Sequence, residues 1–328
     1  MKEIEVPEAV SDLAAWAVLA GSNLRLVQGA GGNLSVKDDS VMWIKASGTR
    51  LSTALEYNIF TPMDWDATRS AVLETEDLAQ HVVPDLPGSD LRPSIETALH
   101  ALLPHQYVFH LHAIGSIAAG LSGEKVEAVA ESLRVEGRTV LVVPYAKPGI
   151  ELARAVIDRL PGDLNPSHTL VLMLRNHGLV VAGPSIESVW RQIEEIESEL
   201  VTVPMASRSD AASADGWSEM FPPGTLSDIA ITALCAGALT PDSAVFLGPR
   251  PFVREHSEQL SIASAIVTDS GAVQAKLGLG DDEVEILVSL VDAARQLQSA
   301  AQWSALSDEQ VAELVNWEAE KWRHQMKR

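Results

Sequence analysis

The chain has 328 residues, of which 46% are hydrophobic and 21% are charged, as in globular proteins of one or two domains. Its 45 acidic and 24 basic residues give a formal net charge of −21, which argues against nucleic acid and anionic membranes as partners but allows a small anionic substrate. Cys235 is the only cysteine, and because no stretch has the pattern of a signal peptide or a membrane span, the sequence predicts a cytoplasmic protein.

The first two hundred residues alternate between helical and strand-like patterns. Apolar spacing predicts an opening helix over 7–20, and the polar turn 38–40 joins two alternating runs, which predicts a hairpin of strands 33–37 and 41–45. Such alternation favours an α/β domain, which we place at residues 1–204. Further helices are expected over 94–102, 124–135, 148–160 and 184–200, and further strands over 107–112, 140–143, 170–174 and 179–182.

The composition changes beyond residue 200. Small polar residues over 205–217 predict a linker. Residues 218–328 then predict a smaller α/β extension that has no cofactor site of its own and no motif that carries chemistry. Its expected helices are 226–236, 281–297 and 308–323, and its expected strands are 244–247 and 265–268.

Three histidines could bind one metal ion. In a strand, His110 and His112 point to the same face, so both imidazoles can reach one ion. His177 follows an apolar run at a strand end, and Gly178 permits a sharp turn there. Three neutral ligands and an open position are typical of a catalytic metal site. The alternatives are two histidines that line a sheet face and a turn histidine bonded to backbone.

Glu96 lies in the first turn of the predicted helix over 94–102. It could act as a general base or a displaceable metal ligand beside the ion, or it could simply stabilise the helix dipole. His100, one helical turn later, could compete as a ligand, but we interpret it as a residue of the core or the surroundings of the site.

Two small-residue turns are candidates for anion binding. In the first, 29–35, glycines allow backbone N–H groups to approach an anion, and Asn33 and Ser35 add donors. The second is 45–49. Neither has the spacing of a P-loop or of a complete dinucleotide fingerprint, so the turns predict either a phosphate or carboxylate pocket or ordinary loops.

Six separated motifs, taken in order, resemble those of the class II aldolase/adducin family. They are GAGGNLSV, KASG, PSIE, the HLH pair, PYAKPG and LRNHGLVVAG. The resemblance covers residues 8–202. The strings RPSIETALHALLP and VPYAKPGIELA are especially similar to the aldolase half of bifunctional rhamnulose-1-phosphate aldolase/alcohol dehydrogenase proteins.

The resemblance implies a three-layer α/β fold with a central, mainly antiparallel sheet, assembled as a homotetramer. The family's ligands for one divalent ion, zinc, fall on His110, His112 and His177, and its metal-neighbouring acid/base carboxylate falls on Glu96. The positions implied in binding the substrate are Gly32, Asn33, Ser47, Gly48 and Ser94.

The implied activity is that of a carbon–carbon lyase. It would cleave a small sugar phosphate or a related hydroxy-carbonyl compound through a metal-stabilised enediolate, with Glu96 as the base that forms the enediolate during condensation. A decarboxylase or an epimerase could use the same site. An alternative of another class is a non-catalytic scaffold, as in adducins, which keep the fold without the metal.

Three features depart from the pattern of the relatives. Ile95 replaces a hydroxyl residue that many of them carry beside the glutamate, which removes one phosphate contact. The family often uses a tyrosine from a neighbouring subunit as proton donor, and Tyr145 is the candidate by default.

Only Gly278-Leu279-Gly280 resembles a nucleotide-binding turn, and Asp281 and Asp282 would repel a pyrophosphate there, so we expect no redox activity. We expect the extension to pack against the first domain or a neighbouring subunit.

Overall fold

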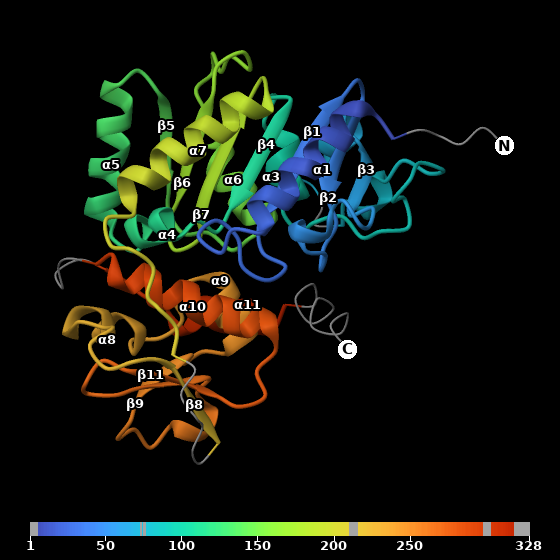
Figure 1. Ribbon diagram of the computed structural model, residues 1–328. Helices are drawn as coiled ribbons and strands as arrows, with labels where there is room; N and C mark the ends of the chain where they lie inside the picture. Colours follow the sequence, from blue (N-terminus) through green and yellow to red (C-terminus); the bar gives the residue numbers. More distant parts are fainter. Residues whose placement is uncertain (1–5, 73, 75–76, 210–215, 298–302, 318–328) are drawn as a thin grey trace.

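A seven-stranded sheet forms the centre of the first domain in the computed structural model, which describes residues 6–72, 74, 77–209, 216–297 and 303–317 (Figure 1). The strand order is β3-β2-β1-β4-β7-β6-β5, and of the described strand pairs in this sheet only β5 and β6 run parallel. The predicted mainly antiparallel sheet is therefore confirmed. Its strands are β1 (Asn33–Asp38), β2 (Val41–Lys45), β3 (Phe60–Asp64), β4 (Tyr107–Leu111), β5 (Thr139–Val143), β6 (Leu170–Leu174) and β7 (Gly178–Gly183).

Helices cover both faces of this sheet and complete the three predicted layers. Successive side chains of a strand point to opposite faces. In β7, Leu179 and Val181 therefore join the core on one side, whereas Val180 joins the core on the other. The first side is covered by α1 (Glu8–Gly21), α4 (Ile114–Gly120), α5 (Gly123–Val135) and α7 (Ile186–Leu200), and the second by α2 (Trp65–Ala71), α3 (Thr97–Leu102) and α6 (Ile150–Ile157). Short 3₁₀ turns lie at Leu51–Thr53 and Ala79–His81.

The extension has its own four-stranded sheet, ordered β8-β11-β10-β9, and its own apolar core. It lies against one end of the first domain, where α10 packs on α4 (Figure 1). Across the described residues, no helix has the length and apolar character needed to cross a membrane. The elements of the extension are β8 (Trp217–Phe221), α8 (Asp228–Leu234), α9 (Pro241–Leu247), β9 (Phe252–Arg254), a 3₁₀ turn at Leu260–Ile262, β10 (Ala265–Val267), β11 (Val273–Lys276), α10 (Asp281–Arg295) and α11 (Asp308–Val315).

The expected strand over 244–247 is wrong, because these residues form the end of helix α9. Thr240 and Ser243 form a capping box, and Pro241 occupies the first turn, where its missing N–H costs nothing. These start signals outweigh the β-like composition of the four residues. Residues 210–215 of the expected linker and 318–323 of the last expected helix lie outside the described residues.

A buried carboxylate fixes the helix that follows β4. Glu197 of α7 accepts hydrogen bonds from the backbone N–H groups of Gly115 at 2.8 Å and Ser116 at 2.9 Å, and also from the Ser116 hydroxyl. A carboxylate at the N-terminus of α4 satisfies donors that the helix itself leaves unpaired and interacts favourably with the helix dipole. This contact ties α7 to the segment that carries two of the candidate ligands.

We expect Glu197→Ala to lower the free energy of unfolding by about 2–4 kcal/mol, because it leaves buried donors without an acceptor. The matched control is Glu199→Ala, which removes an exposed carboxylate from the same helix and should change stability by less than about 0.5 kcal/mol. Urea unfolding followed by circular dichroism measures both. Equal stabilities of the two variants would contradict this assignment.

Candidate functional site

The candidate metal centre lies at one end of β1, β4 and β7. Asn33 opens β1 and pairs directly with His110 of β4, so the register of these strands places both at the same end of the sheet. His112 follows β4 immediately. The alternation of side chains puts His110 on the face covered by α3, at whose N-terminus Glu96 lies.

The turn between β6 and β7 carries the third imidazole, that of His177. Asn176 adopts a left-handed conformation with φ of 56°, and His177 follows it. A Cβ atom on Gly178 would lie 2.3 Å from the Leu111 carbonyl oxygen, so only glycine allows this turn to close onto β4. The predicted role of Gly178 is thus confirmed, since the close approach brings His177 beside the end of β4.

The three imidazoles form a buried cluster. One ring nitrogen from each of His110, His112 and His177 lies within 4.8 Å of the other two. His110 Nδ1 lies 3.1 Å from the Leu179 carbonyl oxygen, which can only accept, so Nδ1 carries the proton and Nε2 keeps its lone pair. His110 Nε2, His112 Nε2 and His177 Nδ1 are buried and have no hydrogen-bond partner among the described residues.

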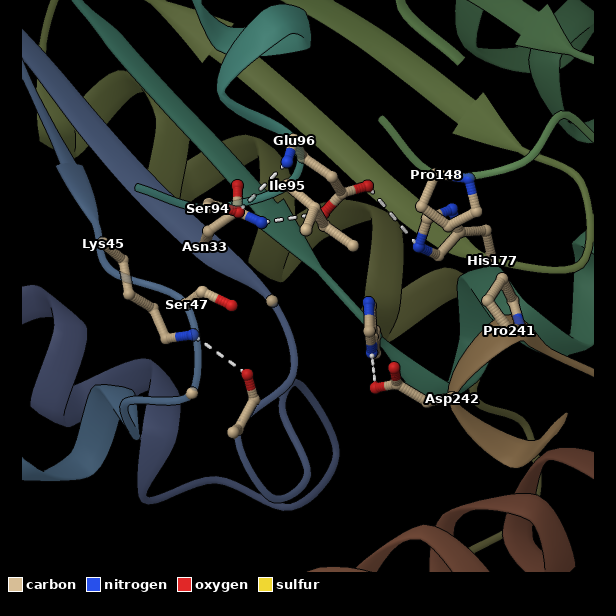
Figure 2. Close-up of a pocket in the computed structure, with 14 residues that line it drawn as sticks. Asn33, Lys45, Ser47, Ser94, Ile95, Glu96, Pro148, His177, Pro241 and Asp242 are labelled. Atoms are coloured by element: carbon tan, nitrogen blue, oxygen red, sulfur yellow. Dashed lines mark hydrogen bonds and ion pairs between the residues drawn. The ribbon is translucent and has the colours of Figure 1, made fainter. Parts of the chain in front are cut away.

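Glu96 lies between the imidazoles, as Figure 2 shows for His177. It occupies the N-cap position of α3 and not the first turn, because the helix begins at Thr97. Its Oε2 accepts a hydrogen bond from Asn33 Nδ2 at 2.8 Å and lies 3.4 Å from His110 Nε2. Its Oε1 lies 3.6 Å from His177 Nε2 and has no hydrogen-bond partner among the described residues.

Burial sets the protonation of the imidazoles. It lowers the pKa of His177 to about 3, although the Glu96 carboxylate acts to raise it, and it also lowers the pKa of His110. Burial would raise the pKa of Glu96, but the three imidazoles and the Asn33 amide outweigh it and hold that pKa at about 2. At neutral pH the site therefore places the neutral imidazoles of His110 and His177 beside an ionised carboxylate.

This arrangement fits a divalent metal ion. Neutral imidazole and carboxylate are the forms in which these groups bind zinc and related ions. Buried nitrogens without partners cost free energy unless a ligand satisfies them. One ring nitrogen from each of the three histidines, together with the adjoining carboxylate, supplies what such an ion requires.

The polar residues predicted to bind substrate surround the same pocket (Figure 2). The sequence interpretation missed the contribution of Lys45, whose ammonium donates to the Ala30 carbonyl oxygen at 2.9 Å. Its position in the KASG motif was the available signal. The pocket lining includes Gly32, Asn33, Ser47, Gly48, Ser94, Ile95, Glu96, His112 and His177, all discussed from the sequence.

Two other candidates lie outside the pocket. His100 is buried and its Nδ1 is 2.7 Å from the Ser35 hydroxyl, so it belongs to the surroundings of the site and not to the ligand cluster. Tyr145 is absent from the pocket lining of the described residues. It packs instead against Ala238 and Ala244 of the extension, and burial raises the pKa of its phenol. The role of Tyr145 as proton donor therefore stays a prediction, because Tyr145 is not among the described residues that line the pocket.

The extension contributes directly to the site, although its sequence contains no motif that indicates this. Pro241 and Asp242, at the start of α9, line the pocket (Figure 2). Asp242 Oδ2 lies 3.0 Å from His112 Nδ1. With the extension in this position the cavity between these residues is small, about 30 Å³.

Two curated relatives match part of this chain. The "uncharacterized oxidoreductase YuxG" of Bacillus subtilis (strain 168) is 31% identical over 213 residues, which is 60% of this chain and 29% of that protein. The chain therefore matches less than a third of the length of that relative. The L-fuculose phosphate aldolase of Methanococcus vannielii is 25% identical over 175 residues, which is 53% of this chain and 83% of that protein.

A solved structure and a family model also match part of this chain. The N-terminal class II aldolase domain of a conserved protein from Thermoplasma acidophilum is 26% identical, with a TM-score of 0.49, over 61% of this chain and 95% of that one. The family model described as "Class II Aldolase and Adducin N-terminal domain" matches residues 11–200, more than half of the chain and all four residues of the candidate metal centre. On this match, the chain belongs to the class II aldolase and adducin family.

Proposed function

We propose that this protein is a metal-dependent aldolase, a carbon–carbon lyase that cleaves a small sugar phosphate or a related hydroxy-carbonyl compound. The observation that carries the proposal is the ionised Glu96 carboxylate beside the imidazoles of His110 and His177. An acid/base group next to a metal centre suits the proton transfers of an aldol reaction. A purely non-catalytic scaffold has no need for this combination.

We assign one divalent ion, zinc, to His110, His112 and His177. When bound, such an ion supplies Lewis-acid stabilisation of negative charge that develops on substrate oxygens. The protein holds the ligands ready: Leu179 accepts the Nδ1 proton of His110, and Gly178 lets His177 approach β4. Each contact already restricts the orientation of an imidazole, so less conformational freedom is lost when the ion binds.

Glu96 is the proposed general base. In the condensation direction it removes a proton from the donor substrate at the carbon that forms the new bond, while the aldehyde oxygen takes up a proton from solvent to become the hydroxyl; in cleavage both transfers run in reverse. Asn33 fixes Oε2 through a hydrogen bond of 2.8 Å, which leaves Oε1 to exchange the proton. The low pKa of the carboxyl group keeps it ionised, and hence able to accept a proton, at neutral pH.

The donor groups of the pocket support an anionic substrate. Asn33, Ser47, Ser94 and the backbone near Gly32 and Gly48 offer N–H and O–H groups, as a phosphate or carboxylate requires. The buried ammonium of Lys45 adds a positive charge to the same wall inside an acidic protein.

Ile95 contributes an apolar surface to the pocket at the position where many relatives carry a hydroxyl residue. A substrate that carries a carboxylate in place of a phosphate has a smaller anionic group. Its binding would therefore be weakened less by the missing hydroxyl. Decarboxylation or epimerisation of such a compound is the second candidate reaction.

A substrate screen tests this proposal. Purified, metal-loaded protein is incubated with an aldehyde and with dihydroxyacetone phosphate, pyruvate or glycolaldehyde as donor, and products are followed by mass spectrometry. We expect a new carbon–carbon bond with at least one donor, and far less product with Glu96→Gln. Release of carbon dioxide or an epimer from a hydroxy acid, without aldol product, would favour the second candidate.

We also propose a homotetramer, as the family resemblance implies. Light scattering after size exclusion at micromolar concentration should give four times the mass of the chain. A mass equal to a single chain would contradict the proposed assembly without affecting the metal centre.

A further inference from the structure

The extension places a carboxylate on the outer edge of one candidate ligand. Asp242 is buried, and its Oδ2 lies 3.0 Å from His112 Nδ1, the ring nitrogen opposite the unpartnered Nε2 (Figure 2). A Cβ atom on Gly31 would lie 2.7 Å from the same Nδ1 and 3.0 Å from the same Oδ2. The glycine-rich turn therefore closes over this pair with no room for a side chain.

Several contacts hold Asp242 in this place. The capping box of Thr240 and Ser243 fixes the start of α9 around it. Asn176, the neighbour of His177, donates hydrogen bonds to the carbonyl oxygens of Leu239 at 3.1 Å and Ser304 at 2.8 Å. The turn that carries one imidazole is thus bonded to the segment that carries Asp242.

A second set of contacts, which lies farther from the imidazoles, also holds the extension in place. Arg50 forms ion pairs with Asp282 and Glu285 of α10, and Glu285 also accepts a hydrogen bond from the Gly29 backbone at 2.6 Å. These contacts fix the extension against the glycine-rich turn without touching a candidate ligand. They provide a control for general loosening of the extension.

The position of Asp242 favours one tautomer of a neutral His112 imidazole. A neutral imidazole carries one proton, and a lone pair on Nδ1 would be repelled by a carboxylate oxygen 3.0 Å away. The proton therefore stays on Nδ1, and Nε2 presents its lone pair to the cluster. Carboxylates beside metal-binding histidines fix tautomer and ring orientation in this way.

We propose that Asp242 is a positioning residue of the metal centre, so that the extension completes the site and does more than cover it. This inference rests on the proposed metal site. Asp242 acts through His112: it holds the imidazole in the tautomer that binds the ion and raises the basicity of Nε2.

The test compares metal binding by Asp242→Asn with that of wild-type protein and of Asp228→Asn. Asp228 is an exposed first-turn acid of α8, so its replacement controls for the loss of a helix-dipole contact in the extension. Zinc dissociation constants are measured by competition with a chromophoric chelator, and the visible spectrum of the cobalt(II)-loaded protein reports the ligand field. We expect Asp242→Asn to weaken zinc binding about 10–100-fold and to shift the cobalt spectrum, and Asp228→Asn to change neither.

Two further variants keep the outcome decisive. Asp242→Ser retains a side chain that suits the start of a helix and should show the same loss if the asparagine variant folds poorly. Arg50→Gln removes the contacts to Asp282 and Glu285 and should leave both readouts unchanged. Wild-type zinc affinity in both Asp242 variants, or an equal loss in Arg50→Gln, would overturn the inference. Absence of zinc binding by the wild-type protein would contradict the proposed function instead.

Discussion

Replacing His112 by alanine should abolish binding of the divalent ion at micromolar concentrations. His112 provides one of the three nitrogens that lie within 4.8 Å of one another. Replacing a residue that only supports a ligand typically lowers metal affinity by roughly 10–100-fold, and removal of a direct ligand lowers it further. We therefore expect zinc affinity to fall by more than about 100-fold. Metal content after dialysis against buffered zinc, measured by plasma mass spectrometry, gives the stoichiometry of the wild-type chain and of the variant.

The matched control is His256→Ala. His256, with Glu255 and Asp269, forms the other group of potential ligands among the described residues, but it lies on the surface of the extension. Its replacement should leave one ion per chain. If His256→Ala removed the ion and His112→Ala retained it, the metal centre assigned to the end of β4 would be wrong.

Glu96→Gln should retain the metal and lose most of the activity. The amide keeps the size of the side chain and an oxygen that can accept the hydrogen bond from Asn33, but it cannot take up the substrate proton. Positioned acid/base groups contribute about 10²–10⁴-fold in rate, so kcat should fall by this factor. Steady-state kinetics on a substrate identified by the screen, with metal content measured on the same samples, separates the two effects.

The distribution of this loss between kcat and KM carries the mechanistic information. A group that acts only in the transition state lowers kcat and kcat/KM together, whereas a group that only binds substrate raises KM. Glu96→Gln should follow the first pattern. A kcat within about threefold of the wild-type value, at full metal occupancy, would remove Glu96 from the proton transfer.

Local patterns in the sequence predicted most elements of the first domain and brought two candidate ligands to one strand face, whereas the mainly antiparallel sheet was implied by the family resemblance. The continuous apolar runs of β6 and β7 reflect a sheet covered on both faces. The spacing of His110 and His112 follows from the two-residue period of a strand. The turn after His177 was also indicated locally by Gly178, whereas the close approach of this glycine to the Leu111 carbonyl oxygen is a tertiary contact. The capping signals of Thr240 and Pro241 were local too, but the apolar composition of 244–247 obscured them.

Only the tertiary structure decided which polar groups meet. The hydrogen bond between Asn33 and Glu96 joins residues 63 positions apart, and the contact of Asp242 with His112 depends on how a separate unit docks. No periodicity or capping rule encodes such contacts, because they arise from the packing of elements whose relative placement is set by the whole apolar core. The same packing places Tyr145, the proton-donor candidate by default, against the extension and outside the described pocket lining.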